Sequence, residues 1–223
     1  MKSATNPKSL FITFEGIDGS GKSTICRMAA AELRRRGTEV KETAEPTDTW
    51  TGKAVRQSIR EGNPITTALL FVADRANHAE QIRKWLDGGE IVVCDRYFDS
   101  TFAYQKAALA GKMRSPEKWL KAIHSFDFPK PDITFLFDID PKVGLERISG
   151  REVKEKFEKL EFLKKVRKNY LALAKAEPER FVVVNASLPR KEVAKKVMDA
   201  ILKTLNCTRT TSFSPPAPPS RRL

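Results

Sequence analysis

The chain has 223 residues, of which 31% are charged and 40% hydrophobic, and its formal net charge is +13 at pH 7. This composition is typical of one globular domain that buries a core without disulfides, and no apolar run reaches the ~20 residues that a membrane-spanning helix needs. The three cysteines, Cys26, Cys94 and Cys207, are odd in number and widely spaced, which argues against a disulfide framework or a zinc site. Cys26 and Cys94 are expected to be buried.

The basic charge alone fits either nucleic-acid binding or the handling of small polyphosphates. Most Lys and Arg residues are scattered, and the one dense stretch, 151–168, holds eight basic residues against four glutamates. Such mixed charge is typical of a solvated helix face. We therefore expect neither a nucleic-acid nor a membrane partner. Residues 1–8 form a polar N-terminal arm without the apolar segment of a signal peptide, so we expect a cytoplasmic protein.

The most informative segment follows the first predicted strand. Residues 16–23 read Gly-Ile-Asp-Gly-Ser-Gly-Lys-Ser, which is the G-x-x-x-x-G-K-[ST] pattern of a P-loop. The glycines let backbone N–H groups turn toward a phosphate, and the following helix adds partial positive charge. Lys22 is expected to reach the β- and γ-phosphates of a nucleotide, and Ser23 is expected to hold Mg²⁺.

Apolar β-rich runs alternate with segments of helical period along the rest of the chain. The predicted strands are 10–14, 39–43, 91–94, 133–139 and 181–184. The predicted helices are 24–36, 52–60, 66–86, 100–109, 116–125, one starting at 141, 152–175 and 190–205. This order predicts an α/β, three-layer P-loop NTPase fold, with about five parallel strands flanked by helices and a ligand crevice at their carboxyl ends.

The chain therefore reads as a single domain over 9–205. The segment 206–223 is rich in Pro, Ser and Thr, a composition that predicts a disordered tail.

Other loops narrow the class of nucleotide-binding protein. Residues 129–132, Pro-Lys-Pro-Asp, approximate the N/T-K-x-D loop of regulatory GTPases, but they precede a strand instead of following one, which disfavours a GTPase. The strand at 91–94 leads into Asp95-Arg96-Tyr97, whereas DNA-handling ATPases usually have paired acids there. An acid followed by an arginine at this strand end therefore disfavours a DNA-handling ATPase.

Taken together, these loops resemble those of the thymidylate kinases, P-loop nucleoside monophosphate kinases, from residue 9 to about 205. The matching segments are 14–24, Glu45-Pro46, 70–75, 95–97, 100–105, 130–132 and 184–187. The resemblance implies transfer of the γ-phosphoryl group of ATP to dTMP, giving dTDP for dTTP biosynthesis, with Mg²⁺ as cofactor. Family members commonly form homodimers, and we expect one here on that likeness alone.

The resemblance also implies a set of site residues. Those for ATP are Gly16, Ile17, Asp18, Gly19, Ser20, Gly21, Lys22, Ser23, Thr24, Arg147, Asn185 and Ala186. Those for the acceptor nucleotide are Asp18, Phe71, Arg75, Arg96, Ser100, Thr101, Tyr104 and Gln105. The metal-binding pair is Ser23 and Asp95, and the catalytic residues are Lys22, Arg96 and Arg151.

The resemblance implies a role for several of these residues, and the chemistry of each side chain fits that role. The guanidinium fork of Arg96 matches two phosphate oxygens, and Asp95 would support Mg²⁺ through water. Phe71 would stack on the pyrimidine, with Arg75 one helical turn on and bonded to its carbonyl edge. Tyr104 would fill the space of a 2′-hydroxyl.

Asp18 would accept a hydrogen bond from the 3′-hydroxyl. The acceptor phosphate, whose second pKa is about 6, is ionised at neutral pH and needs no general base. His78 and His124 therefore need no catalytic role, and each is interpreted as a surface or packing residue.

A mobile helical lid is expected at about 147–160. The P-loop has no arginine among its variable positions, so the catalytic arginine would come from this lid, as Arg151, with Arg147 against the adenine or its phosphates. Two departures from the family pattern are Ala44, where arginine is common, and Lys156, where the lid usually has arginine. Arg56 is a candidate to compensate, although an exposed helix arginine is the simpler interpretation.

Two alternatives stay open. Uracil lacks only one methyl group of thymine, worth ~1–3 kcal/mol, so a kinase of another or several nucleoside monophosphates, such as dUMP or UMP, fits the same pattern. A P-loop ATPase stimulated by nucleic acid belongs to another class, and it predicts strongly salt-dependent polynucleotide binding.

Overall fold

The computed structural model describes residues 9–148 and 153–210, without the side chains of 153–158 and 207–210. Five strands form one sheet: β1 Leu10–Gly16, β2 Val40–Ala44, β3 Ile91–Asp95, β4 Ile133–Asp138 and β5 Phe181–Asn185. They lie in the order β2-β3-β1-β4-β5, and every neighbouring pair is parallel. The predicted fold class is confirmed, including the weakly apolar second strand.

The helices follow the predicted order. They are α1 Lys22–Arg35, α2 Trp50–Glu61, α3 Pro64–Asp87, α4 Phe98–Leu109, α5 Pro116–Ile123, α6 Pro141–Ile148, α7 Val153–Ala176 and α8 Arg190–Thr210. At the start of α3, Asn63 Oδ1 accepts a hydrogen bond from Ile65 N at 2.8 Å, with proline at the first helical position. Helix α8 continues to Thr210, so 206–210 are helical instead of part of the predicted disordered tail. Residues 211–223 lie outside the described residues.

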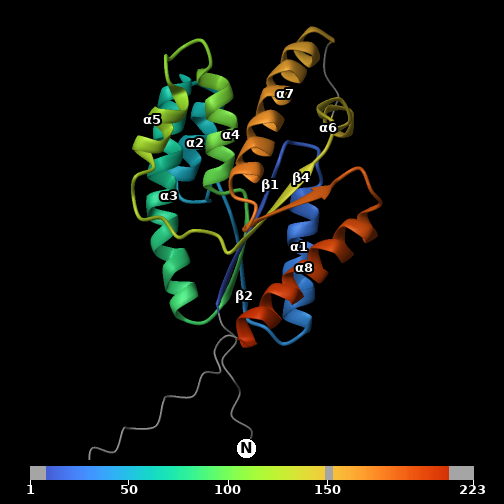
Figure 1. The fold of residues 1–223 in the computed structure, drawn as a ribbon. Helices are drawn as coiled ribbons and strands as arrows, with labels where there is room; N and C mark the ends of the chain where they lie inside the picture. The colour runs from blue at the N-terminus through green and yellow to red at the C-terminus, as the bar shows by residue number, and fades with distance from the viewer. Residues whose placement is uncertain (1–8, 149–152, 211–223) are drawn as a thin grey trace, which may run out of the picture.

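Helices cover both faces of the sheet (Figure 1). On one face α1 and α8 pack together, and on the other lie α3, α4 and α7, with α2 against α3 and α5 against α4. All seven residues of β1 are buried, as expected for a central parallel strand covered on both sides. Cys26 and Cys94 are buried free thiols, as predicted. Among the described helices, none combines the length and apolar character that crossing a membrane requires.

The strand register places the ends of β1, β3 and β4 side by side. Phe14 of β1 pairs with Asp95 of β3, and Gly16 pairs with Phe137 of β4. The loop after β1 therefore begins between the segment after Asp95 and the end of β4. Ligand sites of open parallel sheets lie at such carboxyl ends.

Close packing fixes the loop after β1 against α6. Gly19 has a φ of +80°, and a Cβ atom there would lie 2.1 Å from the carbonyl oxygen of Gly144. A side chain at position 19 would therefore clash with the backbone of α6 as well as strain its own conformation. The loop consequently rests on the helix that leads into the expected lid.

Candidate active site

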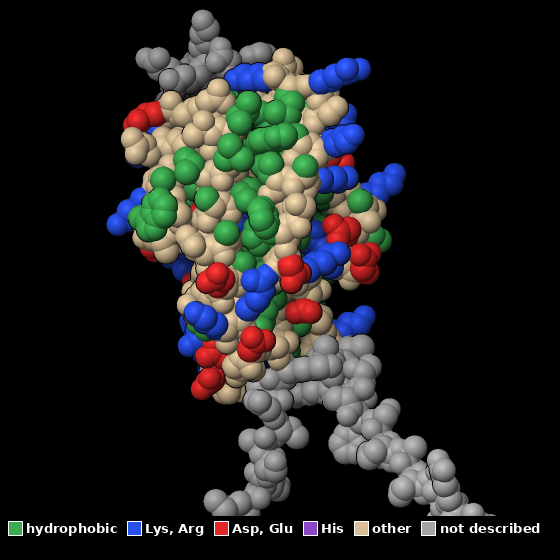
Figure 2. All heavy atoms as spheres, turned by 90° about the vertical axis from the view of Figure 1, so that its left-hand side faces the viewer, with side chains coloured by type: hydrophobic (Ala, Val, Ile, Leu, Met, Phe, Trp, Pro, Cys, Tyr) green, Lys and Arg blue, Asp and Glu red, His purple; other side chains and the backbone are tan. Residues whose placement is uncertain are grey.

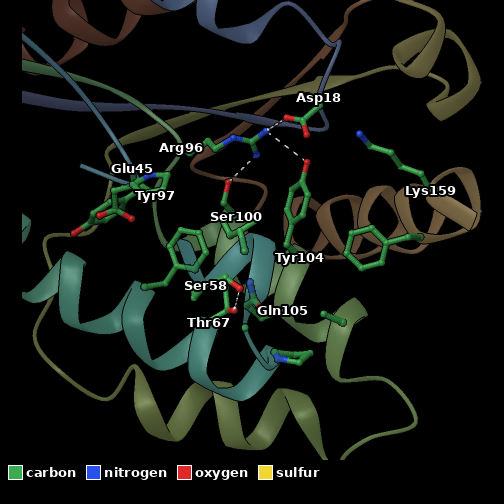
Figure 3. A pocket seen from close by; sticks show the side chains of 17 residues that line it. Asp18, Glu45, Ser58, Thr67, Arg96, Tyr97, Ser100, Tyr104, Gln105 and Lys159 are labelled. Carbon is green, nitrogen blue, oxygen red and sulfur yellow. Dashed lines mark hydrogen bonds and ion pairs between the residues drawn. The ribbon is translucent and has the colours of Figure 1, made fainter. Parts of the chain in front are cut away.

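Two cavities open at the carboxyl edge of the sheet. The first has a volume of about 870 Å³ and lies between the P-loop and the start of α8. The second, of about 510 Å³, is enclosed by α2, α3, α4 and α7 (Figure 3). Asp18 lines both cavities, so a ligand in one can meet a ligand in the other at this residue.

The first cavity contains most of the residues predicted to bind ATP. Its lining includes Asp18, Gly19, Ser20, Gly21, Lys22, Ser23, Thr24, Arg147 and Ala186. Arg147 Nη1 donates to the carbonyl of Ala186 at 3.2 Å and to that of Gly19 at 3.4 Å. The lining residues that the sequence did not single out are Ile25, Ile148, Ser187, Leu188, Pro189, Arg190 and Val193.

Three of the residues predicted for ATP lie beside this cavity without lining it. Gly16 is packed against β4, where a Cβ would lie 2.7 Å from the carbonyl of Phe137, and Ile17 belongs to the buried core. Asn185 Oδ1 accepts a hydrogen bond from Ser187 N at 2.9 Å. These three shape the loops that carry the lining residues.

Lys22 is the buried cation of the first cavity. It begins α1, and its Nζ lies 3.9 Å from Asp18 Oδ1. Burial and the positive charge of Arg96 together lower the pKa of Lys22 to about 8, against the opposing effect of nearby carboxylates. An anion bound in this cavity would therefore stabilise the protonated lysine.

Mg²⁺ fits the oxygen atoms at the end of β3 and the start of α1. Asp95 Oδ1 is buried without a hydrogen-bond partner, and the hydroxyl-bearing Ser23 lines the first cavity. A buried oxygen without a partner is costly unless a cation or water satisfies it. Within residues 9–148 and 153–210 no cluster of three or more His, Cys, Asp or Glu side chains could form a protein cage for a metal. One carboxylate and one hydroxyl suit Mg²⁺, which keeps several waters and uses few carboxylates together with nucleotide phosphates.

Arg96 is the cation of the second cavity. Its Nη2 donates to Asp18 Oδ1 at 2.6 Å, and its Nη1 donates to Ser100 Oγ at 3.2 Å (Figure 3). The guanidinium carbon lies 5.1 Å from the centre of the Tyr104 ring. Burial would raise the pKa of Asp18, but the charges of Arg96 and Lys22 keep it below its usual value.

The walls of the second cavity are largely apolar and aromatic. Phe71 of α3 and Tyr104 and Gln105 of α4 line it, together with Phe162 of α7. The Tyr104 ring centre lies 6.2 Å from that of Phe162. A cavity with aromatic walls, a few polar groups and an arginine suits a flat ring that carries an anionic group. The residues predicted from the resemblance that line this cavity are Asp18, Phe71, Arg96, Ser100, Tyr104 and Gln105.

Arg75 and Thr101 lie behind the wall of this cavity. The Arg75 guanidinium is fully buried, and its Nε donates to Glu45 Oε2 at 3.0 Å. Its Nη2 donates to Thr101 Oγ1 at 3.0 Å and also to Glu45. In this structure Arg75 therefore has no exposed surface for the base contact that the resemblance implies, and Glu45 lines the cavity in front of it.

Both histidines belong to the hydrogen-bond network around Arg75 and Glu45, His78 buried and His124 partly buried, so they are packing residues, one of the two roles expected. Burial and the charge of Arg75 lower the pKa of His124 to about 4. Its neutral ring donates from Nδ1 to the Leu120 carbonyl at 2.8 Å and accepts from Arg75 Nη1 at 2.9 Å. His78 bridges Glu45 Oε1 at 3.0 Å and Thr43 Oγ1 at 2.7 Å.

The expected lid is described only in part. Arg151 lies outside the described residues, as do the side chains of 156–158. Lys159, which the sequence analysis did not single out, lines the second cavity and points toward Asp18 (Figure 3). It adds a cation to the wall opposite Arg96.

Arg56 does not line the second cavity. Its guanidinium donates to the carbonyls of Thr47 at 2.5 Å and Pro46 at 3.0 Å, and it pairs with Asp48 at 2.9 Å. Arg56 therefore holds the loop after β2, which favours the simpler interpretation of this residue. Arg56 therefore does not replace the arginine that the family commonly has at the position of Ala44.

Comparison with known proteins identifies the family. A family model described as thymidylate kinase matches residues 14–197. The chain belongs to the thymidylate kinase family. Relatives named probable thymidylate kinase include those of Methanosarcina mazei, 44% identical over 195 residues, and Methanoculleus marisnigri, 45% identical over 196 residues. The alignments cover 86% of this chain, and 95% and 94% of the two relatives.

A thymidylate kinase of Thermomicrobium roseum is 40% identical over 206 residues, which cover 88% of this chain and 96% of that protein. Membership in the thymidylate kinase family confirms the resemblance drawn from the sequence and makes the protein a kinase. It also agrees with the parallel sheet and the P-loop described above.

The lowered pKa of Lys22 predicts a pH dependence for a thymidylate kinase with this site. Above about pH 8 the free enzyme loses the Lys22 proton, so kcat/KM for ATP should fall as pH rises through that value. Bound triphosphate stabilises the protonated form, so kcat at saturating ATP should fall only at higher pH. The measurement is a profile of both parameters from pH 6.5 to 9.5 at constant ionic strength. A kcat/KM for ATP that stays flat over this range would contradict the prediction.

Proposed function

We propose that this protein transfers the γ-phosphoryl group of ATP to dTMP and produces dTDP. The observation that carries the proposal is the pair of cavities that meet at Asp18, one containing the P-loop lysine and the other Arg96. Two anionic nucleotides bound in these cavities would meet end to end. The names of the relatives in the thymidylate kinase family support the choice of acceptor.

In this mechanism the protein positions charges and does little covalent chemistry. The attacking oxygen belongs to the acceptor phosphate, which is ionised at neutral pH. Lys22 holds the β- and γ-phosphates of ATP, and Arg96 holds the acceptor phosphate in line with them. The Ser23 hydroxyl, and Asp95 through water, would hold Mg²⁺, which would supply positive charge to the β- and γ-phosphates. We assign the remaining catalytic cation to Arg151 of the lid, and Arg147 to the ATP side.

The second cavity would select the acceptor by shape. Phe71 would stack on the pyrimidine, and Tyr104 would occupy the space of a ribose 2′-hydroxyl. Gln105 and Ser100 add polar atoms to the wall, and Asp18 would meet the sugar once Arg96 engages the phosphate. We also propose a cytoplasmic location and no nucleic-acid partner, since both proposed substrates are small nucleotides.

A coupled assay tests the proposed function. ATP and Mg²⁺ are offered with each deoxy- and ribonucleoside monophosphate in turn, and ADP formation is followed. We expect dTMP to give the highest kcat/KM, with dUMP lower by about 10- to 100-fold because it lacks the methyl group. A polynucleotide-stimulated ATPase without phosphorylation of any monophosphate would overturn the proposal in favour of the nucleic-acid alternative.

The proposed assembly is a homodimer through α3. Its exposed residues Leu69, Ala73 and Ala76 repeat at helical spacing and form an apolar stripe, in which the two alanines are small. Hydrophobic side chains gather on the face that carries α2, α3 and α5 (Figure 2). A contiguous apolar patch that is larger than those on a typical monomer surface marks a protein interface. Small residues such as the two alanines let two helices approach closely.

Ala73→Glu should convert such a dimer to a monomer because it places a charge in the middle of the stripe. Sedimentation velocity measures the change. The matched control is Ala172→Glu on α7, an exposed alanine away from α3, which should leave the mass unchanged. A monomeric wild-type protein, or an Ala73→Glu dimer of unchanged affinity, would contradict the proposed interface.

A further inference from the structure

The backbone of Arg96 has an unusual conformation. Its φ is +68°, and no other residue except glycine has a positive φ in the described part of the chain. The left-handed region is unfavourable for residues with a Cβ atom, so such a conformation persists only where surrounding contacts hold it. On its amino side, Arg96 N donates to the Phe14 carbonyl at 3.0 Å.

The contact on the other side comes from Glu15, the last residue before the P-loop glycine Gly16. Glu15 Oε1 accepts a hydrogen bond from Tyr97 N at 2.7 Å, which fixes the peptide that follows Arg96. The Phe14 carbonyl and the Glu15 side chain, from adjacent residues of β1, thus hold the peptides on either side of Arg96. Strand β1 therefore controls the conformation of the arginine backbone.

The second oxygen of Glu15 controls the arginine side chain. Glu15 Oε2 accepts from Ser100 Oγ at 2.6 Å and from Tyr170 of α7 at 2.9 Å. Ser100 Oγ in turn accepts from Arg96 Nη1 at 3.2 Å. One carboxylate therefore fixes both the peptide after Arg96 and the hydroxyl that receives its guanidinium.

A carboxylate in this place is costly to the fold. Glu15 has no exposed surface, and burial together with Asp99 raises its pKa to about 7, against the opposing effects of Ser100, Arg96 and Tyr97 N. An apolar residue would serve the core of β1 better, since its six neighbours on the strand are also buried. The Glu15 carboxylate instead accepts hydrogen bonds from Tyr97 N, which follows Arg96, and from the hydroxyls of Ser100 and Tyr170 beside it.

We propose that Glu15 is the positioning residue of the acceptor-phosphate arginine: it holds Arg96 in the left-handed conformation that aims its guanidinium into the second cavity. The residue lies on the strand that leads into the P-loop, so donor and acceptor groups share one rigid support. This inference rests on the proposed function, in which Arg96 binds the acceptor phosphate.

The test is Glu15→Gln, which keeps the size of the side chain and removes its charge. Its amide would face the two hydroxyls that now donate to Oε2, which disturbs the support of Arg96. We expect KM for dTMP to rise at least tenfold, while KM for ATP and the affinity for ATP measured by calorimetry stay within about twofold of wild type. An unchanged KM for dTMP, or equal losses for both substrates, would overturn the proposal.

Asp99→Asn is the matched control. Asp99 is a second fully buried carboxylate close to Glu15, but its oxygens bind Arg180, with both distances 2.8 Å. We expect it to lower the thermal melting temperature without raising the ratio of the KM for dTMP to that for ATP. A similar rise in that ratio would mean that the Glu15→Gln defect is a general consequence of losing a buried charge.

Tyr170→Phe keeps the test decisive if Glu15→Gln fails to fold. It removes one donor to Glu15 Oε2 and leaves the carboxylate in place, so KM for dTMP should rise about threefold with KM for ATP unchanged. Equal KM values in Tyr170→Phe and wild type would then overturn the proposal. If the wild-type protein phosphorylated no monophosphate, the proposed function would be wrong. That result comes from the wild-type assay alone and is therefore distinct from the outcome of the Glu15 variants.

Discussion

Replacing Lys22 with alanine is expected to lower kcat by about 10³-fold while the protein remains folded. The reason is that Lys22 is the buried cation of the P-loop cavity, and removal of a single group that stabilises transition-state charge costs about 10²–10³-fold or more. The fold should tolerate the change because the Lys22 ion pair with Asp18 is long, at 3.9 Å, and Asp18 keeps its 2.6 Å contact with Arg96.

Single-turnover phosphoryl transfer from ATP measures the effect, and circular dichroism and thermal melting check the fold. The matched control is Lys53→Ala, which removes an exposed lysine of α2 and should leave kcat unchanged. Normal turnover of Lys22→Ala would contradict the assignment of the P-loop as the donor site.

Replacing Arg96 with alanine is expected to raise KM for dTMP roughly 100-fold, with binding of ATP retained. Charge-assisted hydrogen bonds are worth about 1.5–3 kcal/mol each, so the loss of a two-pronged contact with phosphate amounts to at least two factors of ten in affinity. Asp18 loses its 2.6 Å partner and keeps the longer contact with Lys22, and its side chain is 49% exposed, so water can solvate it. The fold should therefore change little.

Initial rates at varied dTMP and a separate titration of ATP measure the two effects. Arg56→Ala is the matched control, since Arg56 holds the loop after β2 and does not line the acceptor cavity. It should change KM for dTMP by less than about threefold. Loss of ATP binding by Arg96→Ala, or an equal defect in Arg56→Ala, would show that the acceptor site has been misplaced.

The sequence was sufficient to predict the sheet and the P-loop because both are local patterns. Each strand is a short apolar run between segments of helical period, and the parallel order follows from their alternation. Gly19 and Lys22 were assigned from a contiguous motif. The end of α8 was placed too early because composition alone does not indicate that the helix continues to Thr210.

The contacts of the residues that surround the two cavities could not be predicted in this way. Arg75 was expected at the base, yet it is enclosed by Glu45 and His124, residues that lie 30 and 49 positions away. Nothing in the local pattern indicates that these groups converge. Lys159 was missed for a similar reason, since it sits in a stretch of mixed charge that is typical of a solvated helix. Glu15 lay just past the predicted strand 10–14, and nothing in the local pattern indicates that its side chain reaches the Arg96 peptide.

The 2.6 Å contact between Asp18 and Arg96 has a consequence for ligands that lack a phosphate. The Asp18 carboxylate serves as an internal counter-ion of the Arg96 guanidinium, so a phosphate ligand has to compete with it for this contact. A doubly charged monoester can displace this intramolecular partner, whereas an uncharged nucleoside such as thymidine cannot. Asp18, a residue of the donor loop, is therefore expected to disfavour the binding of unphosphorylated nucleosides.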